Sequence, residues 1–258
     1  MGSSIFRVAA AQLSSTGDPV ENLAAVEEWT QRAADDGAQL VVFPEATMAC
    51  FGTRLAQVAE DLDGPFASGV RGVARRCGVT VAVGMFTPAS QGRVHNTVMV
   101  SGPAGEWRYD KVHLYDAFGS RESDYVAPGR EVVTAQVGDV TVGVATCYDV
   151  RFADQFTALG RAGAQVVVLP ASWSDGPGKA EQWDLLTRAR AMDAQAYLVA
   201  CDQAWRPSKG DDALGIGRSV VADPVGGVRA RLGHESGLLV TDVDLTLVEQ
   251  VRRRIPIL

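Results

Sequence analysis

Residues 33–46, AADDGAQLVVFPEA, contain a helix end, a glycine, Ala-Gln, a continuous apolar run and a proline. Residues 159–172, LGRAGAQVVVLPAS, repeat this order. A glycine commonly ends a helix, and a continuous apolar run suits a strand covered on both faces. Because each copy follows a strand and a helix, the repeat predicts two strand–helix–strand halves packed together. We therefore expect an α/β fold, a layered sandwich with internal pseudo-two-fold symmetry.

Short apolar runs alternate with helical patterns along the rest of the chain. Strands are expected at 5–11, 38–44, 79–86, 94–101, 140–147, 165–169, 197–201, 216–222 and 236–243, and helices at 19–36, 65–77, 153–162 and 179–196. In the last helix an apolar stripe at helical spacing should face the core, formed by Leu185, Ala189, Met192 and Ala196. No linker or composition shift divides the chain, which predicts a single domain over residues 1–258.

Composition and charge exclude several classes of protein. The 258 residues are 47% hydrophobic and 21% charged, as in ordinary globular domains. A net charge of −7 argues against nucleic acid or an anionic membrane as partner, because both need a basic surface. The basic run VRRRIPIL at 251–258 fits a solvated helix end or an oligomer contact better. There is no leader pattern and no apolar run of about 18 residues, so we expect no membrane span.

Four cysteines, at positions 50, 77, 147 and 201, show neither C-x-x-C spacing nor the density of a disulfide scaffold. Reduced thiols in a cytoplasmic protein are the expectation, and a zinc site is not favoured. Cys147 lies in VATCYDVRF (144–152), where a strand gives way to a helix. A helix N-terminus lowers the pKa of a thiol and offers backbone N–H groups to an oxyanion. Position alone leaves a nucleophile and a small core side chain equally open.

A cysteine nucleophile needs a base, and the chain has three histidines. His95 and His234 fit surface or structural roles, and His113 in YDKVHLYD is the strongest of the three. Its neighbour Lys111 is unusual, because lysine is rare in this arginine-rich chain and a compact ammonium can donate to an oxyanion. Glu45 follows the strand of the first repeat, at the edge where α/β proteins place ligands.

Three segments in order resemble the signature segments of the nitrilase superfamily of carbon–nitrogen hydrolases: LVVFPEA with Glu45, RYDKVHL with Lys111 and ATCYDVRF with Cys147. RESDYVAPG, with Glu122, resembles the segment that carries the family's second glutamate. The resemblance implies a four-layer α-β-β-α sandwich, one carbon–nitrogen hydrolase domain and at least a homodimer. No cofactor and no metal are called for.

The resemblance also implies a Glu-Lys-Cys triad acting on a small-molecule amide. Cys147 would attack the amide carbonyl while Glu45 takes the thiol proton. Lys111 and the backbone N–H of Tyr148 would hold the oxyanion, and Glu122 would orient Lys111 or the substrate. A thioester on Cys147 would then be hydrolysed.

The substrate is less closely defined. CYDVRF is most similar to the branch of omega-amidases and deaminated glutathione amidases, whose amides carry a carboxylate. Arg151 would bind that carboxylate or pair with Asp149, and Ser172 and Trp173 would line the pocket. The loop VHLYDAFGSR (112–121) is shorter than the omega-amidase pattern, which keeps N-carbamoyl amino acid or nitrile hydrolysis as alternatives. Other classes are a catalytically silent scaffold and a thiol redox sensor, for which Cys50 would be the resolving candidate.

Overall fold

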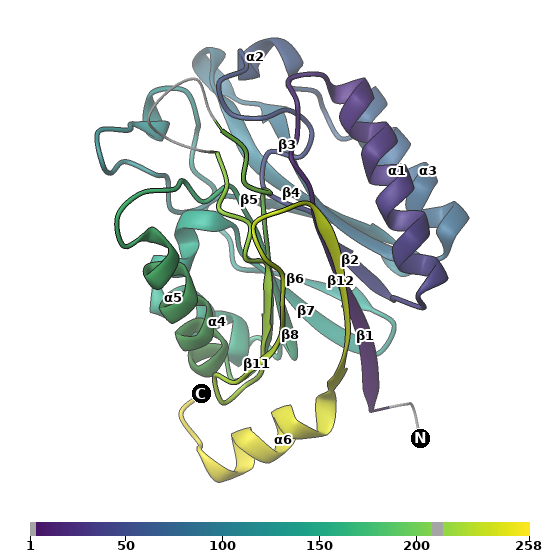
Figure 1. Ribbon diagram of the computed structural model, residues 1–258, viewed down its shortest axis with the longest axis vertical. Helices are drawn as coiled ribbons and strands as arrows, with labels where there is room; N and C mark the ends of the chain where they lie inside the picture. The colour runs from purple at the N-terminus through teal and green to yellow at the C-terminus, as the bar shows by residue number, and fades with distance from the viewer. Residues whose placement is uncertain (1–3, 208–213) are drawn as a thin grey trace.

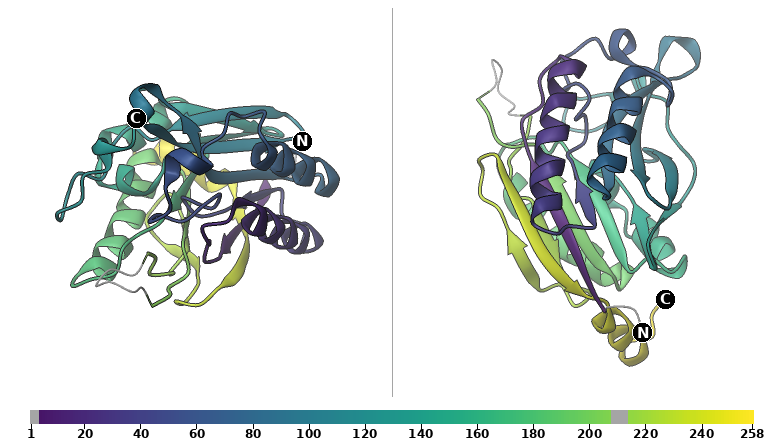
Figure 2. Two further views of the ribbon diagram at one scale, coloured as in Figure 1. Left: turned by 90° about the horizontal axis from the view of Figure 1, so that it is seen from above. Right: turned by 90° about the vertical axis from the view of Figure 1, so that its right-hand side faces the viewer.

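Two six-stranded mixed sheets lie face to face, with helices on their outer faces (Figures 1 and 2). The computed structural model describes residues 4–207 and 214–258. The first sheet has the order β12-β1-β2-β3-β4-β5, formed by Gly237–Asp244, Ile5–Gln12, Leu40–Val42, Thr80–Pro88, Val94–Gly102 and Gly105–Asp110. The second has the order β11-β10-β9-β8-β7-β6, formed by Val228–Arg231, Val220–Ala222, Tyr197–Asp202, Val166–Ala171, Val140–Val144 and Val133–Val137.

The helices complete the four predicted layers. On the first sheet lie α1 (Pro19–Asp35) and α3 (Pro65–Cys77), and on the second lie α4 (Ala153–Arg161) and α5 (Lys179–Ala194). Short helices α2 (Leu55–Val58), η1 (Ser90–Gly92), η2 (Glu122–Asp124) and η3 (Cys147–Arg151) lie in the loops, and α6 (Leu245–Arg254) ends the fold. No described helix is both long and apolar enough to cross a membrane.

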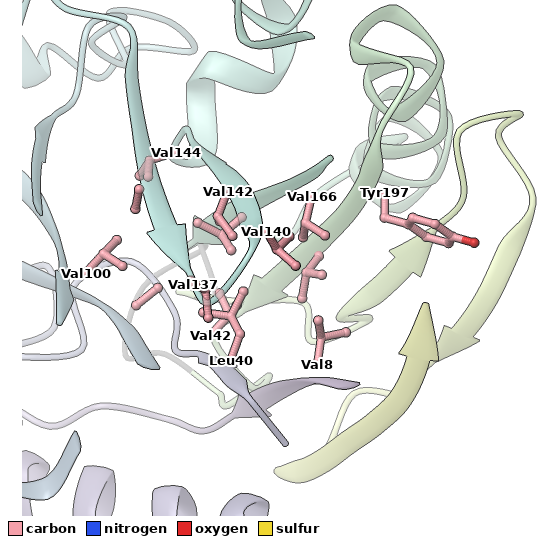
Figure 3. Packing of buried hydrophobic residues seen from close by; sticks show 14 of the residues in the cluster. Val8, Leu40, Val42, Val100, Val137, Val140, Val142, Val144, Val166 and Tyr197 are labelled. Atoms are coloured by element: carbon pink, nitrogen blue, oxygen red, sulfur yellow. The ribbon is translucent and has the colours of Figure 1, made fainter. Parts of the chain in front are cut away.

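The central core lies between the two sheets, and the alternation of strand side chains explains its composition. Leu40 and Val42 of β2 point toward the second sheet, whose Val142 and Val166 belong to the same cluster (Figure 3). Val41, between them, packs with the helices on the outer face instead. Because both faces of these strands are covered, the sequence of each is a continuous apolar run.

The repeat that predicts the symmetry forms the same hydrogen bonds in both halves. Gly37 and Gly163 adopt φ values of 78° and 90°, the left-handed conformation in which glycine ends a helix without strain. The Gln39 and Gln165 side chains accept from the backbone N–H of Arg7 and Thr141, on β1 and β7 respectively. Each glutamine therefore ties the start of its strand to the preceding strand, which is why Ala-Gln recurs.

The expected stripe on α5 is wrong for its two large members, whereas Ala196, just past the end of the helix, is buried. Leu185 and Met192 are 68% and 50% exposed, whereas Trp183 and Thr187 are buried. Trp183 lies about 200° around the helix from Leu185, and its indole donates to the backbone oxygen of Arg218. The larger aromatic side chain thus takes the inward position. The strand expected at 216–222 begins only at Val220. The strands β5, β6 and β11 and the helices α2 and α6 lie outside the expected ranges.

One glycine fixes the position of Glu45. A Cβ atom at Gly84 in β3 would lie 2.6 Å from Ala46 N, 2.8 Å from Pro44 O and 2.9 Å from Glu45 Cα. All three are backbone atoms, so a side chain here would displace the turn that carries Glu45. The turn is already constrained, because Ala46 has a φ of 57°.

We predict that Gly84→Ala destabilises the protein by about 1–3 kcal/mol, the usual cost of overpacking. Gly233→Ala is the matched control, because within the described chain no atom lies within 4 Å of its Cβ position. That variant should change the unfolding free energy by no more than about 0.5 kcal/mol. Urea denaturation of both variants checks this, and equal stabilities would contradict the account.

Candidate active site

The sequence-predicted site residues meet where parallel strands of both sheets end. Glu45 follows β2, Cys147 follows β7, and Ser172 follows β8. A cavity of about 560 Å³ opens there. Its described lining includes seven of the eight predicted residues: Glu45, Lys111, Glu122, Cys147, Tyr148, Ser172 and Trp173.

Lys111 lies between two buried glutamates. Its Nζ is 2.9 Å from Glu45 Oε1 and 2.9 Å from Glu122 Oε2. The three side chains are no more than 3% exposed. Burial by itself would lower the pKa of Lys111, but the charges of Glu122 and Glu45 outweigh it and raise the pKa well above its ordinary value. Lys111 is therefore a fixed cation and not a proton acceptor at neutral pH.

Asn96 of β4 is a site residue that the sequence reasoning missed. Its Nδ2 donates to Glu45 Oε1 at 2.7 Å and to Glu122 Oε1 at 3.2 Å. The amide is fully buried and joins the same two carboxylates as Lys111, but without adding charge. The sequence does mark this residue, because it is an asparagine within the largely apolar strand VHNTVMV at 94–100. A buried polar residue in a strand needs partners, which points to a site.

Cys147 stands at a strained turn. It begins η3 with a φ of 45°, in the left-handed region that non-glycine residues rarely adopt. Burial raises the pKa of its thiol well above the ordinary value, and the charge of Glu45 raises it further, while Lys111 lowers it. The net shift of this pKa is therefore opposite to the lowering expected at a helix N-terminus, because burial and the neighbouring carboxylate dominate. The thiol is neutral at physiological pH.

Asp149 connects the cysteine turn to the lysine segment. Its Oδ2 accepts from Thr146 N at 2.9 Å and from Tyr109 Oη at 2.6 Å. Its Oδ1 accepts from His113 N at 3.1 Å and lies 2.9 Å from His113 Nδ1. His113 also stacks on Phe152 at 3.6 Å between ring centroids. The histidine is thus held by Asp149, which aligns the segments of Cys147 and Lys111.

The remaining predicted residues have distinct environments. The Ser172 N–H donates to Glu45 Oε2 at 3.0 Å, and that of Trp173 donates to the buried Asp202 at 2.7 Å. Arg151 is not among the described residues that line the cavity. Its guanidinium donates to Gln182 Oε1 at 2.7 Å and lies 4.9 Å from the centre of the Trp173 ring.

The other histidines have backbone partners, because His95 Nδ1 lies 3.0 Å from Ala127 O and His234 Nδ1 lies 2.8 Å from Ile216 O. Among residues 4–207 and 214–258, no group of three or more His, Cys, Asp or Glu side chains could hold a metal ion.

Comparison with known proteins gives consistent matches. The sequence model of the carbon–nitrogen hydrolase family matches residues 7–253. A hydrolase of Mycobacterium tuberculosis is 49% identical over 98% of this chain and 94% of its own. The deaminated glutathione amidase of Escherichia coli O157:H7 is 34% identical over 97% and 95% of the two chains, and the omega-amidase NIT2 of Danio rerio is 31% identical over 98% and 93%.

The fold also has a solved counterpart. A variant of the amidase of Nesterenkonia AN1, from the nitrilase superfamily, superposes with a TM-score of 0.81 and 27% identity. The alignment covers 98% of this chain and 96% of that chain. The predicted resemblance and the sandwich of two helix-covered sheets are both confirmed. With a buried cysteine in its cavity, a family match over nearly its full length and amidases among its relatives, the chain belongs to the carbon–nitrogen hydrolase family.

Proposed function

We propose that this protein hydrolyses the carbon–nitrogen bond of a small, carboxylate-bearing amide through a thioester on Cys147. The observation that carries the proposal is the buried ammonium of Lys111, 2.9 Å from carboxylate oxygens of both Glu45 and Glu122 in the cavity that also contains the thiol. The arrangement supports the proposal because a thiol, a carboxylate and a fixed positive charge share one site, as this chemistry requires.

The first step needs a base because the thiol starts neutral. As Cys147 Sγ bonds to the amide carbon, the thiol proton passes to Glu45, the carboxylate whose charge acts on the thiol in the same cavity. The carbonyl electrons move to oxygen, and the Lys111 ammonium and the Tyr148 N–H donate to that oxyanion. Preorganised donors of this kind are worth about 2.7–4 kcal/mol each.

Collapse of the tetrahedral intermediate breaks the carbon–nitrogen bond. Protonated Glu45 gives its proton to the leaving nitrogen, so ammonia or an amine departs and a thioester remains. A water molecule then attacks the thioester while Glu45 accepts its proton, and the acid leaves as the thiol is restored. Throughout, Glu122 and Asn96 keep the Lys111 ammonium and the Glu45 carboxylate in position.

The proposal extends to location and assembly. The four cysteines are free thiols, which supports the cytoplasm. Exposed apolar side chains on α5 and after α6 support a homodimer, because apolar residues this exposed favour a partner surface: Leu185, Met192, Ile255 and Ile257. N-carbamoyl and nitrile substrates would use the same nucleophile and remain alternatives.

Steady-state assays of ammonia release test the reaction. We expect turnover of at least one small ω-amide, with α-ketoglutaramate and succinamate as first substrates. Cys147→Ala should lower kcat by about 10³-fold or more, and Lys111→Met by about 10²–10³-fold. Cys50→Ala should retain activity, because this half-buried thiol packs beside Thr53. Amide turnover at the wild-type rate in Cys147→Ala would refute the proposal, as would a folded wild type that hydrolyses no amide, carbamoyl or nitrile substrate.

The raised thiol pKa gives a second prediction. The charge of Glu45 raises the pKa of Cys147, and the charge of Lys111 lowers it. The titration midpoint of Cys147 should therefore move to lower pH in Glu45→Gln and to higher pH in Lys111→Met. The pH dependence of alkylation by iodoacetamide, followed by mass spectrometry at Cys147, measures the midpoint. The fully buried Cys201 in the same sample reports any general unfolding. A midpoint that rises in Glu45→Gln would show that the carboxylate does not act on the thiol.

A further inference from the structure

A second lysine lines the same cavity as Lys111. Lys179 is the first residue of α5 and is only 7% exposed. The chain contains three lysines among 24 basic residues, and both that lie in the described ranges are buried in this cavity wall. The exposed ion pairs of the described residues use arginine, whereas the two lysines lie where a compact ammonium can approach a bound molecule.

The partners of Lys179 differ from those of Lys111. Its Nζ donates to Tyr115 Oη at 3.2 Å and lies 4.0 Å from the centre of the Phe118 ring and 5.4 Å from that of Trp173. Across the described residues, no carboxylate lies within the 4.0 Å of an ion pair with this ammonium. Aromatic faces stabilise a cation only partly, so the site retains a positive charge without a matching anion.

Asp175, which lies on the cavity wall four positions before Lys179 in the sequence, has other partners. Asp175 is exposed to solvent, its Oδ1 accepts from Gly176 N at 2.8 Å, and its Oδ2 accepts from the Trp205 indole at 3.3 Å. Water screens this exposed carboxylate far more than it screens the buried ammonium.

The position of Lys179 on its helix adds to the positive potential. A cation in the first turn is unfavourable, because the helix dipole places partial positive charge there. The turn is held in place nonetheless. The Trp173 indole donates to Lys179 O at 3.0 Å, and Gly178 precedes the helix with a φ of 73°. A buried lysine at this end of a 16-residue helix is costly unless an anion comes to it.

We propose that Lys179 binds the carboxylate of the substrate's acyl part and thereby selects anionic amides. The Tyr115 hydroxyl, which accepts from Lys179, keeps its own proton to donate to the same carboxylate. The Tyr115 N–H also donates to Glu122 Oε2 at 2.6 Å, so one residue connects the carboxylate site to the glutamate that positions Lys111. This inference rests on the proposed amide hydrolysis and gives Lys179 the role that the sequence suggested for Arg151.

Matched substrates test the selection. Malonamate, succinamate and glutaramate carry a carboxylate, and propionamide, butyramide and valeramide replace it by a methyl group. In the best pair, the wild type should favour the anionic amide in kcat/KM. Lys179→Met should lower kcat/KM for that amide by about 10–100-fold, mostly through KM, because a charged hydrogen bond remote from the reacting carbon is lost. The neutral amide should change by less than about threefold, and Lys179→Arg should recover part of the loss.

A binding measurement separates this inference from the proposed chemistry. Calorimetric titration of succinate into Cys147→Ala should give a Kd at least about tenfold tighter than in Cys147→Ala/Lys179→Met. Equal loss on anionic and neutral amides would overturn the inference, as would equal succinate affinity in the two proteins. The inference would also be overturned if Arg151→Met lost the preference for anionic amides while Lys179→Met kept it. If no amide is hydrolysed but succinate still binds more tightly to Cys147→Ala than to the double variant, only the hydrolase proposal is overturned.

Discussion

The buried ammonium of Lys111 is the interaction on which the site depends. An unpaired charge in a protein interior costs several kcal/mol, and removing one partner of a buried pair typically costs about 3–5 kcal/mol. The two carboxylates that offset this charge come from the loop after β2 and from η2, whereas Lys111 itself follows β5. Any movement of one segment leaves a buried charge without its partner. The electrostatics that the proposed chemistry requires therefore also hold the loops in register.

Hydrogen bonds to the buried side chain of Asp149 extend this constraint to the cysteine. Asp149 receives Thr146 N from the turn of Cys147 and His113 N from the segment of Lys111. Gly84 leaves the turn of Glu45 room to pack directly against β3. The proposed nucleophile, the proposed base and the buried cation thus come from three loops, and each loop is anchored by buried contacts within the protein itself. Such prior positioning is what makes fixed charges effective in catalysis.

The repeat predicted the layered sandwich because its repeated positions meet requirements of the backbone. A glycine in the left-handed conformation ends each helix, and a glutamine side chain joins adjacent strands. Glu45 at a strand end, the rare lysine at position 111 and Cys147 could likewise be selected from the sequence, because each is recognised by its residue type and its local position. The stripe on α5 could not be predicted from periodicity, since a core-facing Trp183 displaced Leu185 to the surface. Asn96 and Lys179 depend on contacts between segments far apart in the chain, which no spacing records. Arg151 looked suitable beside the cysteine, but it contacts Gln182 and Trp173.

Acylation of Cys147 is the step on which the proposed hydrolysis depends, and the way the acyl-enzyme divides between two acceptors shows whether it forms. Hydroxylamine would intercept a thioester to give a hydroxamate in competition with water. If one acyl-enzyme is common to all substrates, then the ratio of hydroxamate to acid at fixed hydroxylamine is the same for a primary amide, an anilide and an ester of one acyl group. A ratio that changes with the leaving group, or acid formation with no hydroxamate at any concentration, would contradict the account.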